Sequence, residues 1–353
     1  MHFTRLAGLL LPAVALAQTY TDCNPTNTTC PSDTGLDDSS YTVDFTAGEN
    51  DDWVMTYGDA SYDDTNGVSF TIDESGEAPT MQSNFYFFFG TVSAVVKAAN
   101  GTGIVSCVIL ESDDLDEIDW EWLGGDVDQV QTNYFGKGNT TSYDRGTYET
   151  VGDSQDTWHN YTIEWTSSYT TWYIDGSAVR TLNYDDAVSG KNYPQTPMRV
   201  KLGVWSASDS GNEGTIEWAG GETDYDDAPF TMHVQSITIQ NYNPGTTYTY
   251  SDLTGDWTSI EIDATDATAT NTTNTESISS SSSAGTTNST SSNSTSSSSS
   301  SSGSSNSSGS SSSSGTSSSS SSSATGSTVT SAAIATVPFV GHALLFAALT
   351  LMF

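Results

Sequence analysis

The composition of the chain changes sharply after Asp263, and this change limits how much of the chain can fold. From about residue 264 to residue 331, Ser, Thr, Asn and Gly dominate the sequence. Such a segment has too few apolar side chains to offset the entropy of folding, about 1–2 kcal/mol for the backbone of each ordered residue. We therefore expect a folded body at residues 18–245, followed by a linker and a disordered, glycosylated Ser/Thr-rich stalk at residues 246–331.

Both ends of the chain have the features of removable targeting segments. Residues 1–17 place Arg5 ahead of an apolar run that ends in Ala15-Leu16-Ala17, which is typical of a secretory signal peptide. Residues 332–353 form an apolar tail behind a short polar spacer and small residues, an order typical of the signal for a GPI anchor. A C-terminal membrane helix is the alternative. In either case the sequence predicts a secreted protein that is tethered to the outer face of the plasma membrane.

Secretion places the cysteines in an oxidising compartment. Cys23 and Cys30 lie close together in a loop with Pro, Asn and Thr, so we predict a local disulfide between them. Cys107 lies inside an apolar run and is expected to be a buried thiol. Asn-x-Ser/Thr sequons are candidates for N-glycosylation, and those in the body should face outward. They are Asn27, Asn100, Asn139 and Asn160 in the body, and Asn271, Asn288, Asn293 and Asn306 in the stalk.

The charge of the chain is strongly acidic, with 44 Asp and Glu against 8 Lys and Arg and a formal net charge of −36. Because phosphate contacts need clustered Lys and Arg, this composition argues against a nucleic-acid partner and against a polyanionic substrate. Acidic loops such as Asp224-Tyr225-Asp226-Asp227 lack the spacing of an EF-hand loop. We therefore expect no metal or other cofactor. We also expect a monomer that meets the membrane only through its lipid anchor.

The amino-acid pattern of the body is typical of a β-protein. Short segments rich in Val, Ile, Thr, Tyr, Phe and Trp are separated by Gly, Asn and Asp, and no stretch forms a convincing long amphipathic helix. Asp175-Gly176, between 172–174 and 178–180, predicts a tight hairpin. We therefore predict an all-β fold, a curved antiparallel β-sandwich of the jelly-roll type.

Acidic and apolar side chains alternate between residues 116 and 124. If this segment is a strand, Glu117, Asp119 and Glu121 share one face, and Ile118 and Trp120 share the other. Carboxylates in a row repel each other, so stability gives no reason to place them there. A solvated acidic face is the alternative. Because the opposite face is apolar, we interpret the strand as internal and its carboxylates as functional.

Glycoside cleavage is the chemistry that uses such carboxylates. One attacks the anomeric carbon, while another, kept protonated, donates to the leaving oxygen, and in a retaining enzyme the two lie about 5–5.5 Å apart. At about 3.3 Å per residue, the Cα atoms of Glu117 and Glu121 would be about 13 Å apart, so their side chains must lean together. Asp119 lies between them, where it can hydrogen-bond the nucleophile and keep one neighbour protonated.

The sequence Glu117-Ile118-Asp119-Trp120-Glu121 resembles the Glu-x-Asp-x-Glu signature of glycoside hydrolase family 16, which consists of retaining enzymes with a curved β-jelly roll. The resemblance continues in the segments 131–138, 158–165 and 172–176. Together with the loop from Cys23 to Cys30, the stalk and the anchor signal, these segments make the chain similar to the fungal Crh-type cell-wall transglycosylases.

That resemblance implies a role for each carboxylate. It makes Glu117 the nucleophile, Glu121 the general acid/base and Asp119 the assisting carboxylate. It also implies a chitin donor and a β-glucan or chitin acceptor, so the expected partners are neutral polysaccharides.

Alternation also predicts a sugar-binding face in the segment 200–205. Lys201, Gly203 and Trp205 would share one face, and the glycine would leave an open floor for a pyranose ring. The ring would stack on Trp205, with its hydroxyl or N-acetyl oxygens near Lys201. This face resembles the donor subsites of the family. The alternative is that Trp205 packs on the sheet.

Further sugar contacts are expected from polar side chains. Read as a strand, the segment 215–218 puts Thr215 and Glu217 on one polar face, and we predict a contact at Thr215. Gln131 and Asn133 share a face and could offer amides to sugar hydroxyls, as the family resemblance implies. His159 is interpreted as structural, because the carboxylates already supply the acid and the base.

The leading hypothesis from sequence is therefore a retaining transglycosylase that cleaves chitin-type β-1,4 chains and transfers the glycosyl unit to β-glucan or chitin, which would crosslink the wall. A hydrolase of chitin or β-glucan on the same fold is an alternative, because transfer and hydrolysis share their first half-reaction. A non-enzymatic wall lectin or adhesin is a third possibility, since a stalked sandwich can bind sugar without catalysis.

Overall fold

The computed structural model describes residues 21–264, and these residues fold mainly as β-strands. Alternating burial shows why. In β7 (Gly90–Lys97) every second side chain is buried, because successive side chains of a strand point to opposite faces of its sheet. The predicted all-β fold is confirmed. The predicted signal peptide, most of the stalk, its four sequons and the anchor signal lie outside the described residues.

Within the described residues the strands form three sheets, and every pairing between named strands is antiparallel. Sheet I has the order β11 (Thr147–Thr150), β10 (Gln129–Phe135), β9 (Glu117–Leu123), β8 (Ile104–Ser112), β15 (Met198–Ser206), β6 (Thr80–Ser83) and β3 (Trp53–Tyr57). Sheet II has the order β14 (Ser177–Asn183), β13 (Tyr169–Ile174), β12 (His159–Trp165), β7, β16 (Phe230–Asn241), β5 (Gly67–Ile72) and β4 (Ser61–Asp63), and β2 (Ser40–Asp44) also pairs with β16. Sheet III has the order β1 (Asp33–Thr34), β17 (Thr247–Tyr250) and β18 (Ile260–Asp263).

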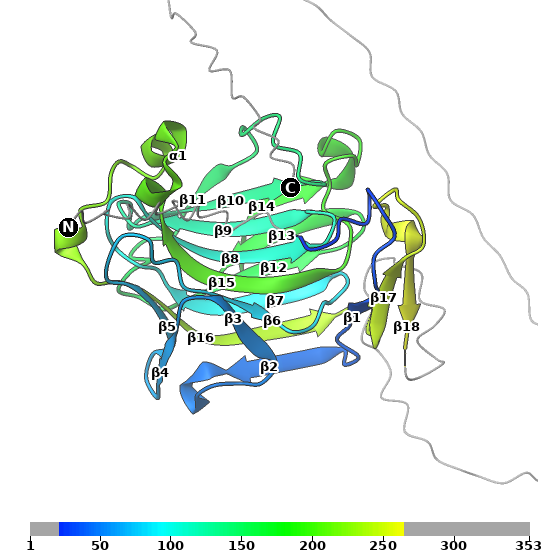
Figure 1. Cartoon of the computed structure of the whole chain (residues 1–353), viewed down its shortest axis with the longest axis horizontal. Helices are drawn as coiled ribbons and strands as arrows, with labels where there is room; N and C mark the ends of the chain where they lie inside the picture. Colours follow the sequence, from blue (N-terminus) through cyan, green and yellow to red (C-terminus); the bar gives the residue numbers. More distant parts are fainter. Residues whose placement is uncertain (1–20, 265–353) are drawn as a thin grey trace, which may run out of the picture. The chain divides into compact units, whose positions relative to one another are not determined.

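Sheets I and II stack face to face, and Figure 1 shows their strands running in two layers with a bowed β15. The main core lies between these layers. Tyr161 of β12 packs edge-on against Trp120 and Trp122 of β9, with ring centroids 5.3 and 4.6 Å apart. Burying one large apolar side chain of this kind contributes about 1.5–3 kcal/mol, so these contacts hold β9 firmly against sheet II.

The predicted hairpin at Asp175-Gly176 is present and connects β13 to β14. Asp175 has φ +49° and Gly176 has φ +77°, which are the two left-handed residues of a type I′ turn. The flanking pairs Ile174–Ser177 and Tyr173–Ala178 confirm the register.

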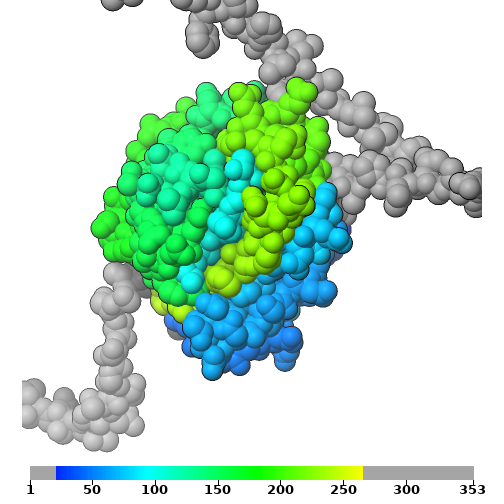
Figure 2. Space-filling model, turned by 90° about the vertical axis from the view of Figure 1, so that its left-hand side faces the viewer, coloured from blue at the N-terminus to red at the C-terminus, as the bar shows by residue number. Residues whose placement is uncertain are grey.

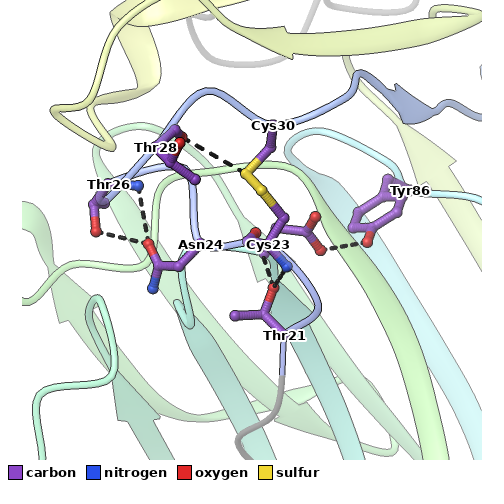
Figure 3. Close-up of a disulfide and its surroundings, with 8 residues drawn as sticks. Thr21, Cys23, Asn24, Thr26, Thr28, Cys30 and Tyr86 are labelled. Atoms are coloured by element: carbon purple, nitrogen blue, oxygen red, sulfur yellow. Dashed lines mark hydrogen bonds between the residues drawn. A yellow bond between two sulfur atoms is a disulfide. The ribbon is translucent and has the colours of Figure 1, made fainter. Parts of the chain in front are cut away.

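The N-terminal loop of the described chain is closed by the predicted disulfide. Cys23 and Cys30 are bonded, with their Cα atoms 5.8 Å apart. Figure 3 shows this loop next to Tyr86. Cys107 is buried and is not disulfide-bonded, as expected; its Sγ donates to the carbonyl oxygen of Gly203 at 3.4 Å.

The folded body continues beyond residue 245, where the sequence analysis placed its end. Strands β17 and β18 follow that residue and pair with β1 to make sheet III. Tyr248 of β17 is fully buried and packs against Phe88 with ring centroids 5.9 Å apart. The segment that was assigned to the linker therefore contributes to the core.

Short helices connect the strands. Among residues 21–264 the α-helix is α1 (Glu213–Trp218), and the 3-10 helices are η1 (Phe45–Ala47), η2 (Tyr184–Asp186), η3 (Ala207–Ser210), η4 (Tyr225–Asp227) and η5 (Trp257–Ser259). In Figure 2 the light-green segment after β15 lies beside blue atoms of the N-terminal part. Asp209 joins the two by accepting from Ser75 Oγ at 2.6 Å and from the Gly76 N–H at 2.9 Å. Over the same residues, no helix is both long and apolar enough to span a membrane.

The body sequons differ in their exposure. Asn27, Asn100 and Asn160 are exposed, in line with the expectation that these sites face outward. Asn139 is only half-buried, and its Nδ2 donates to Asn192 Oδ1 at 2.9 Å. A glycan on Asn139 would therefore replace an existing contact.

Candidate active site

The three acidic residues of β9 lie on the outer face of sheet I, which is the face turned away from sheet II. Glu117, Asp119 and Glu121 alternate along the strand with Ile118 and Trp120, which belong to the main core. Strand β9 is internal, because it pairs with both β8 and β10. The structure therefore has the carboxylates where the alternation predicts them.

All three carboxylates are almost completely withdrawn from solvent. The exposed fractions are 4% for Glu117, 1% for Asp119 and 7% for Glu121. Burial disfavours the charged form of a carboxyl group. It raises the pKa of Glu117 and raises that of Asp119 well above its usual range. The row is thus no solvated acidic face.

The surroundings of Asp119 favour its protonated form. After burial, the negative charges of Glu117 and Glu121 raise the pKa of Asp119 further, and its hydrogen bond with Glu117 adds to this. The same hydrogen bond acts in the opposite direction on Glu117 and lowers its pKa. The hydrogen bond with Asp119 thus favours the ionised form of Glu117, which a carboxylate nucleophile requires, while burial favours the neutral form.

Sheet II also holds the backbone of this site. The indole N–H of Trp172, a fully buried residue of β13, donates to the carbonyl oxygen of Asp119 at 3.1 Å. The guanidinium of Arg180 lies over the Trp172 ring, 4.8 Å from its centroid, and donates to the Thr132 carbonyl oxygen at 2.7 Å. These contacts connect β13 and β14 to β9 and β10. Trp172 lies in the segment 172–176, which carries the family resemblance, but its contact with Asp119 was not predicted.

Arg145 is a second residue that the sequence analysis did not single out. It lies in the connection between β10 and β11, and its guanidinium is 4.8 Å from the ring centroid of Phe135. Phe135 is the cross-strand neighbour of Glu117. The positive charge of Arg145 lowers the pKa of Glu117 and so favours its ionised form. No local sequence pattern joins Arg145 to β9, because the two meet only through the fold of the loop.

The predicted sugar-binding residues of β15 share the outer face with the carboxylates, but they have partners within the protein. Lys201 forms an ion pair with the buried Glu111. Trp205 is 9% exposed and stacks on Trp218, with ring centroids 6.1 Å apart. A Cβ atom at Gly203 would lie 2.8 Å from the Pro79 carbonyl oxygen. The expected open floor at Gly203 is therefore covered by the chain before β6.

The expectation of a strand at residues 215–218 is wrong, because this segment forms α1. Asn212 caps the helix, its Oδ1 accepting from the N–H groups of Gly214 and Thr215 at 2.9 and 3.1 Å. Thr215 and Glu217 therefore do not share the face of a strand. The helix instead brings the half-buried Trp218 onto Trp205.

Gln131 and Asn133 lie on β10, beside the carboxylates. They are the cross-strand neighbours of Glu121 and Asp119, respectively, so the predicted shared face is present. Gln131 is buried, and a Cβ atom at Gly146 would lie 2.9 Å from its amide carbon. The loop before β11 thus covers Gln131, while Asn133 is half-buried.

His159 lies in sheet II, away from this row. Its Nδ1 is 2.7 Å from Asp175 Oδ2, and its Nε2 is 3.1 Å from the Gly152 carbonyl oxygen. Both ring nitrogens thus contact the chain, which agrees with the structural role expected for this residue. Over residues 21–264 the structure contains no group of three or more His, Cys, Asp or Glu side chains that could hold a metal ion.

Comparison with known proteins identifies the family. The model of glycosyl hydrolases family 16 matches residues 47–220, which include β9. Crh-like protein 1 of Aspergillus fumigatus is 57% identical over 261 residues, which make up 74% of this chain and 71% of that protein. The chain belongs to glycosyl hydrolase family 16. Crh-like protein 5 of the same organism is 54% identical over 269 residues, covering 75% of this chain and 68% of its own length.

Solved structures give the same assignment within family 16. A Crh5 transglycosylase in complex with NAG has a TM-score of 0.67 and 56% sequence identity, and it covers 69% of this chain and 100% of its own. The apo form of Crh5 transglycosylase has a TM-score of 0.66 and 55% identity. The predicted jelly-roll fold and the predicted Crh-type family are thus confirmed.

Proposed function

We propose that this family 16 enzyme is a retaining cell-wall transglycosylase, with Glu117 as nucleophile, Glu121 as general acid/base and Asp119 as the assisting carboxylate. The observation that carries the proposal is the row of buried carboxylates on β9, and the hydrogen bond between Asp119 and Glu117, which lowers the pKa of Glu117, supports it. The similarity to Crh5 transglycosylase supports transfer as the outcome of the reaction.

In the first half-reaction, the ionised Glu117 attacks the anomeric carbon of the donor chain. The glycosidic C–O bond breaks, and its oxygen takes the proton of Glu121. The products are a glycosyl ester on Glu117 and a shortened chain that leaves. Asp119 stabilises the charge of Glu117 before the attack, through the hydrogen bond that it donates.

In the second half-reaction, the Glu121 carboxylate takes a proton from a hydroxyl of the acceptor sugar. The acceptor oxygen then attacks the anomeric carbon, and Glu117 leaves as a carboxylate. Two displacements at the same carbon retain its configuration. If water replaces the sugar hydroxyl, the same site becomes a hydrolase, so access of the acceptor decides between transfer and hydrolysis.

We propose chitin-type β-1,4 chains as donors and β-glucan or chitin as acceptors. The strongly acidic chain is suited to neutral substrates, because it would repel polyanions. The proposed sugar contacts are those expected from sequence, namely Lys201, Trp205, Thr215, Gln131 and Asn133, and we add Trp218, since it covers Trp205. A half-buried indole can present one face to the C–H groups of a pyranose ring.

The place of action that we propose is the outer face of the plasma membrane and the cell wall, reached by secretion and held by the stalk and a GPI anchor. The Cys23–Cys30 disulfide supports the secreted location, because such bonds persist in oxidising compartments.

The proposal is tested by incubating the secreted full chain with a chito-oligosaccharide donor and a fluorescent laminari-oligosaccharide acceptor. We expect hybrid products that carry the label, and none with Glu117→Gln, which should retain sugar binding. Release of reducing ends alone would assign the chain to the hydrolases. Sugar binding without any turnover in the unmodified chain would instead identify a lectin.

A further inference from the structure

The turn between β8 and β9, residues 113–116, has a strained backbone directly before the proposed nucleophile. Leu115 has φ +65°, a left-handed conformation that is unfavourable for a residue with a branched side chain. Such a conformation persists only where the surroundings enforce it. Leu115 is two residues from Glu117, so whatever holds the turn also sets where β9 begins.

The carboxylate of Asp116 anchors the end of this turn inside the protein. It is fully buried, and both of its oxygens accept hydrogen bonds from distant segments. The N–H of Lys137 donates to Oδ1 at 2.9 Å, and the N–H of Gln195 donates to Oδ2 at 2.7 Å. The hydroxyl of Thr196 adds a bond to Oδ2 at 3.0 Å. Asp116 thereby joins the start of β9 to the β10–β11 and β14–β15 connections.

Asp114 and Lys137 complete the charge cluster around Asp116. Asp114 is also fully buried, and its Oδ1 accepts from Ser112 Oγ at 2.6 Å and from Thr196 Oγ1 at 2.7 Å. The Lys137 ammonium lies 3.6 Å from Asp116 and 3.8 Å from Asp114. Burial alone would lower the pKa of Lys137, but these two carboxylates outweigh it and raise the pKa. The cluster therefore retains its cation.

The ends of the folded chain cover this cluster. Gly255, between β17 and β18, approaches so closely that a Cβ atom there would collide with Asp114 Oδ2 and would lie 2.7 Å from Lys137 Cε. The same Cβ would be 3.2 Å from Thr26, which belongs to the disulfide loop shown in Figure 3. Segments from both ends of the described chain thus help to keep water from the two carboxylates, while the Lys137 side chain stays partly exposed.

We infer that Asp116 is a positioning residue for Glu117: together with Asp114 and Lys137 it fixes the left-handed turn from which β9 starts. The inference rests on the proposed role of Glu117. Because Asp116 and Glu117 are adjacent, any shift of the turn moves the nucleophile relative to the anomeric carbon. A misplacement of about 1 Å can reduce the rate about 100-fold.

The test compares three variants of the full chain. Asp116→Asn keeps the shape of the side chain but exchanges one acceptor for a donor. Thr196→Val is a milder change, which removes the hydroxyl that bonds both Asp114 and Asp116. Asp113→Asn is the matched control on the same turn, because Asp113 accepts from Tyr86 at 2.5 Å rather than from Lys137, Gln195 or Thr196.

The measurement is the rate at which Glu117 becomes esterified by an epoxyalkyl chito-oligosaccharide, followed by mass spectrometry of the peptide that contains β9. In this reaction the Glu117 carboxylate bonds to an epoxide carbon, the C–O bond of the epoxide breaks, and its oxygen takes the proton of Glu121. At saturating reagent we expect the rate of esterification to fall about ten-fold or more for Asp116→Asn and about three-fold for Thr196→Val. The reagent concentration that gives half of the maximal rate should change by no more than about two-fold, because the nucleophile is misplaced while sugar binding is retained.

The outcomes separate the inference from the proposed function. Equal saturated rates for the unmodified chain and Asp116→Asn would overturn the inference and leave the function intact. If the unmodified chain were not labelled at Glu117, the proposed function would fall, and the inference with it. If Asp116→Asn does not fold, the rate of Thr196→Val tests the inference in its place. A slowed rate in Asp113→Asn would show that any change in the turn has the same effect, and this result would also overturn the inference.

Discussion

Asp119 differs from its neighbours on β9 because both its backbone and its side chain are held. Its carbonyl oxygen accepts from the Trp172 indole, and its carboxyl group forms a hydrogen bond with Glu117 that raises the pKa of Asp119. Local alternation predicted which face the side chain takes, since that depends only on the pleat of a strand. The contact with Trp172 was not predicted, because it depends on how the two sheets stack.

The hydrogen bond from Asp119 predicts a pH effect on the proposed nucleophile. Glu117 must be ionised to react, and the bond from Asp119 lowers its pKa. Asp119→Ala removes the donor, so the pKa of Glu117 should rise, by about one unit for a bond to a charged group. The acid limb of the kcat/KM profile should then move to higher pH. Asp119→Asn retains an N–H donor and should leave that limb in place, and an equal shift in both variants would contradict the assignment.

At the scale of single elements, sheet II supports β9 and the connection before β15 through indole N–H donors as well as apolar contacts. Trp172 donates to Asp119, and Trp165 of β12 donates to the Pro194 carbonyl oxygen at 2.9 Å. Both indoles are fully buried. The peptide that Trp165 holds also carries the Gln195 N–H, which donates to Asp116.

We expect Trp172→Phe and Trp165→Phe each to lower the free energy of unfolding by about 1–3 kcal/mol, since each leaves a buried carbonyl oxygen without its donor. Urea unfolding measures this loss. Both variants should also lower kcat. Trp172→Phe loses a contact with the backbone of Asp119, and Trp165→Phe frees the Pro194–Gln195 peptide, whose N–H donates to Asp116. An unchanged kcat in both variants, at reduced stability, would mean that the two indoles support the core but not the site.

Two elements show where sequence patterns are insufficient. The segment 215–218 is too short for alternation to distinguish a strand from a helix, and the deciding residue, Asn212, lies before it as a cap. The role of Asp116 was missed for a different reason. Its partners Lys137, Gln195 and Thr196 come from other loops, and no local pattern brings them together.

At the scale of the whole folded body, sheet III closes the sandwich with strands from both ends of the described chain. The alternating sequence Thr247-Tyr248-Thr249-Tyr250 was a signal for β17, but its partner β1 is far away in the sequence. The composition changes only after Asp263, yet the sequence analysis assigned residues from 246 onward to the linker. The real end of the fold depends on this long-range pairing.

Chains that end at different residues test this boundary. A chain that ends at residue 264 should unfold at the same temperature as the full chain. A chain that ends at residue 245 loses the buried Tyr248 and uncovers Asp114 and Lys137. Removal of a large core side chain alone costs about 3–5 kcal/mol, which lowers Tm by about 10 °C for a domain of this size. Differential scanning calorimetry measures the difference, and equal Tm values for the two chains would refute a structural role for sheet III.

Sheet III also determines how the folded body responds to mechanical force. The chain leaves the described fold directly after β18, which is the edge strand of this sheet. Tension transmitted from residue 265 onward is thus borne first by the hydrogen bonds between β18 and β17. The loop between these strands covers Asp114 and Lys137, so a pull strong enough to peel β18 away would hydrate the charges behind the nucleophile while sheets I and II remain folded. A folded body pulled at this end would therefore lose activity before sheets I and II unfold.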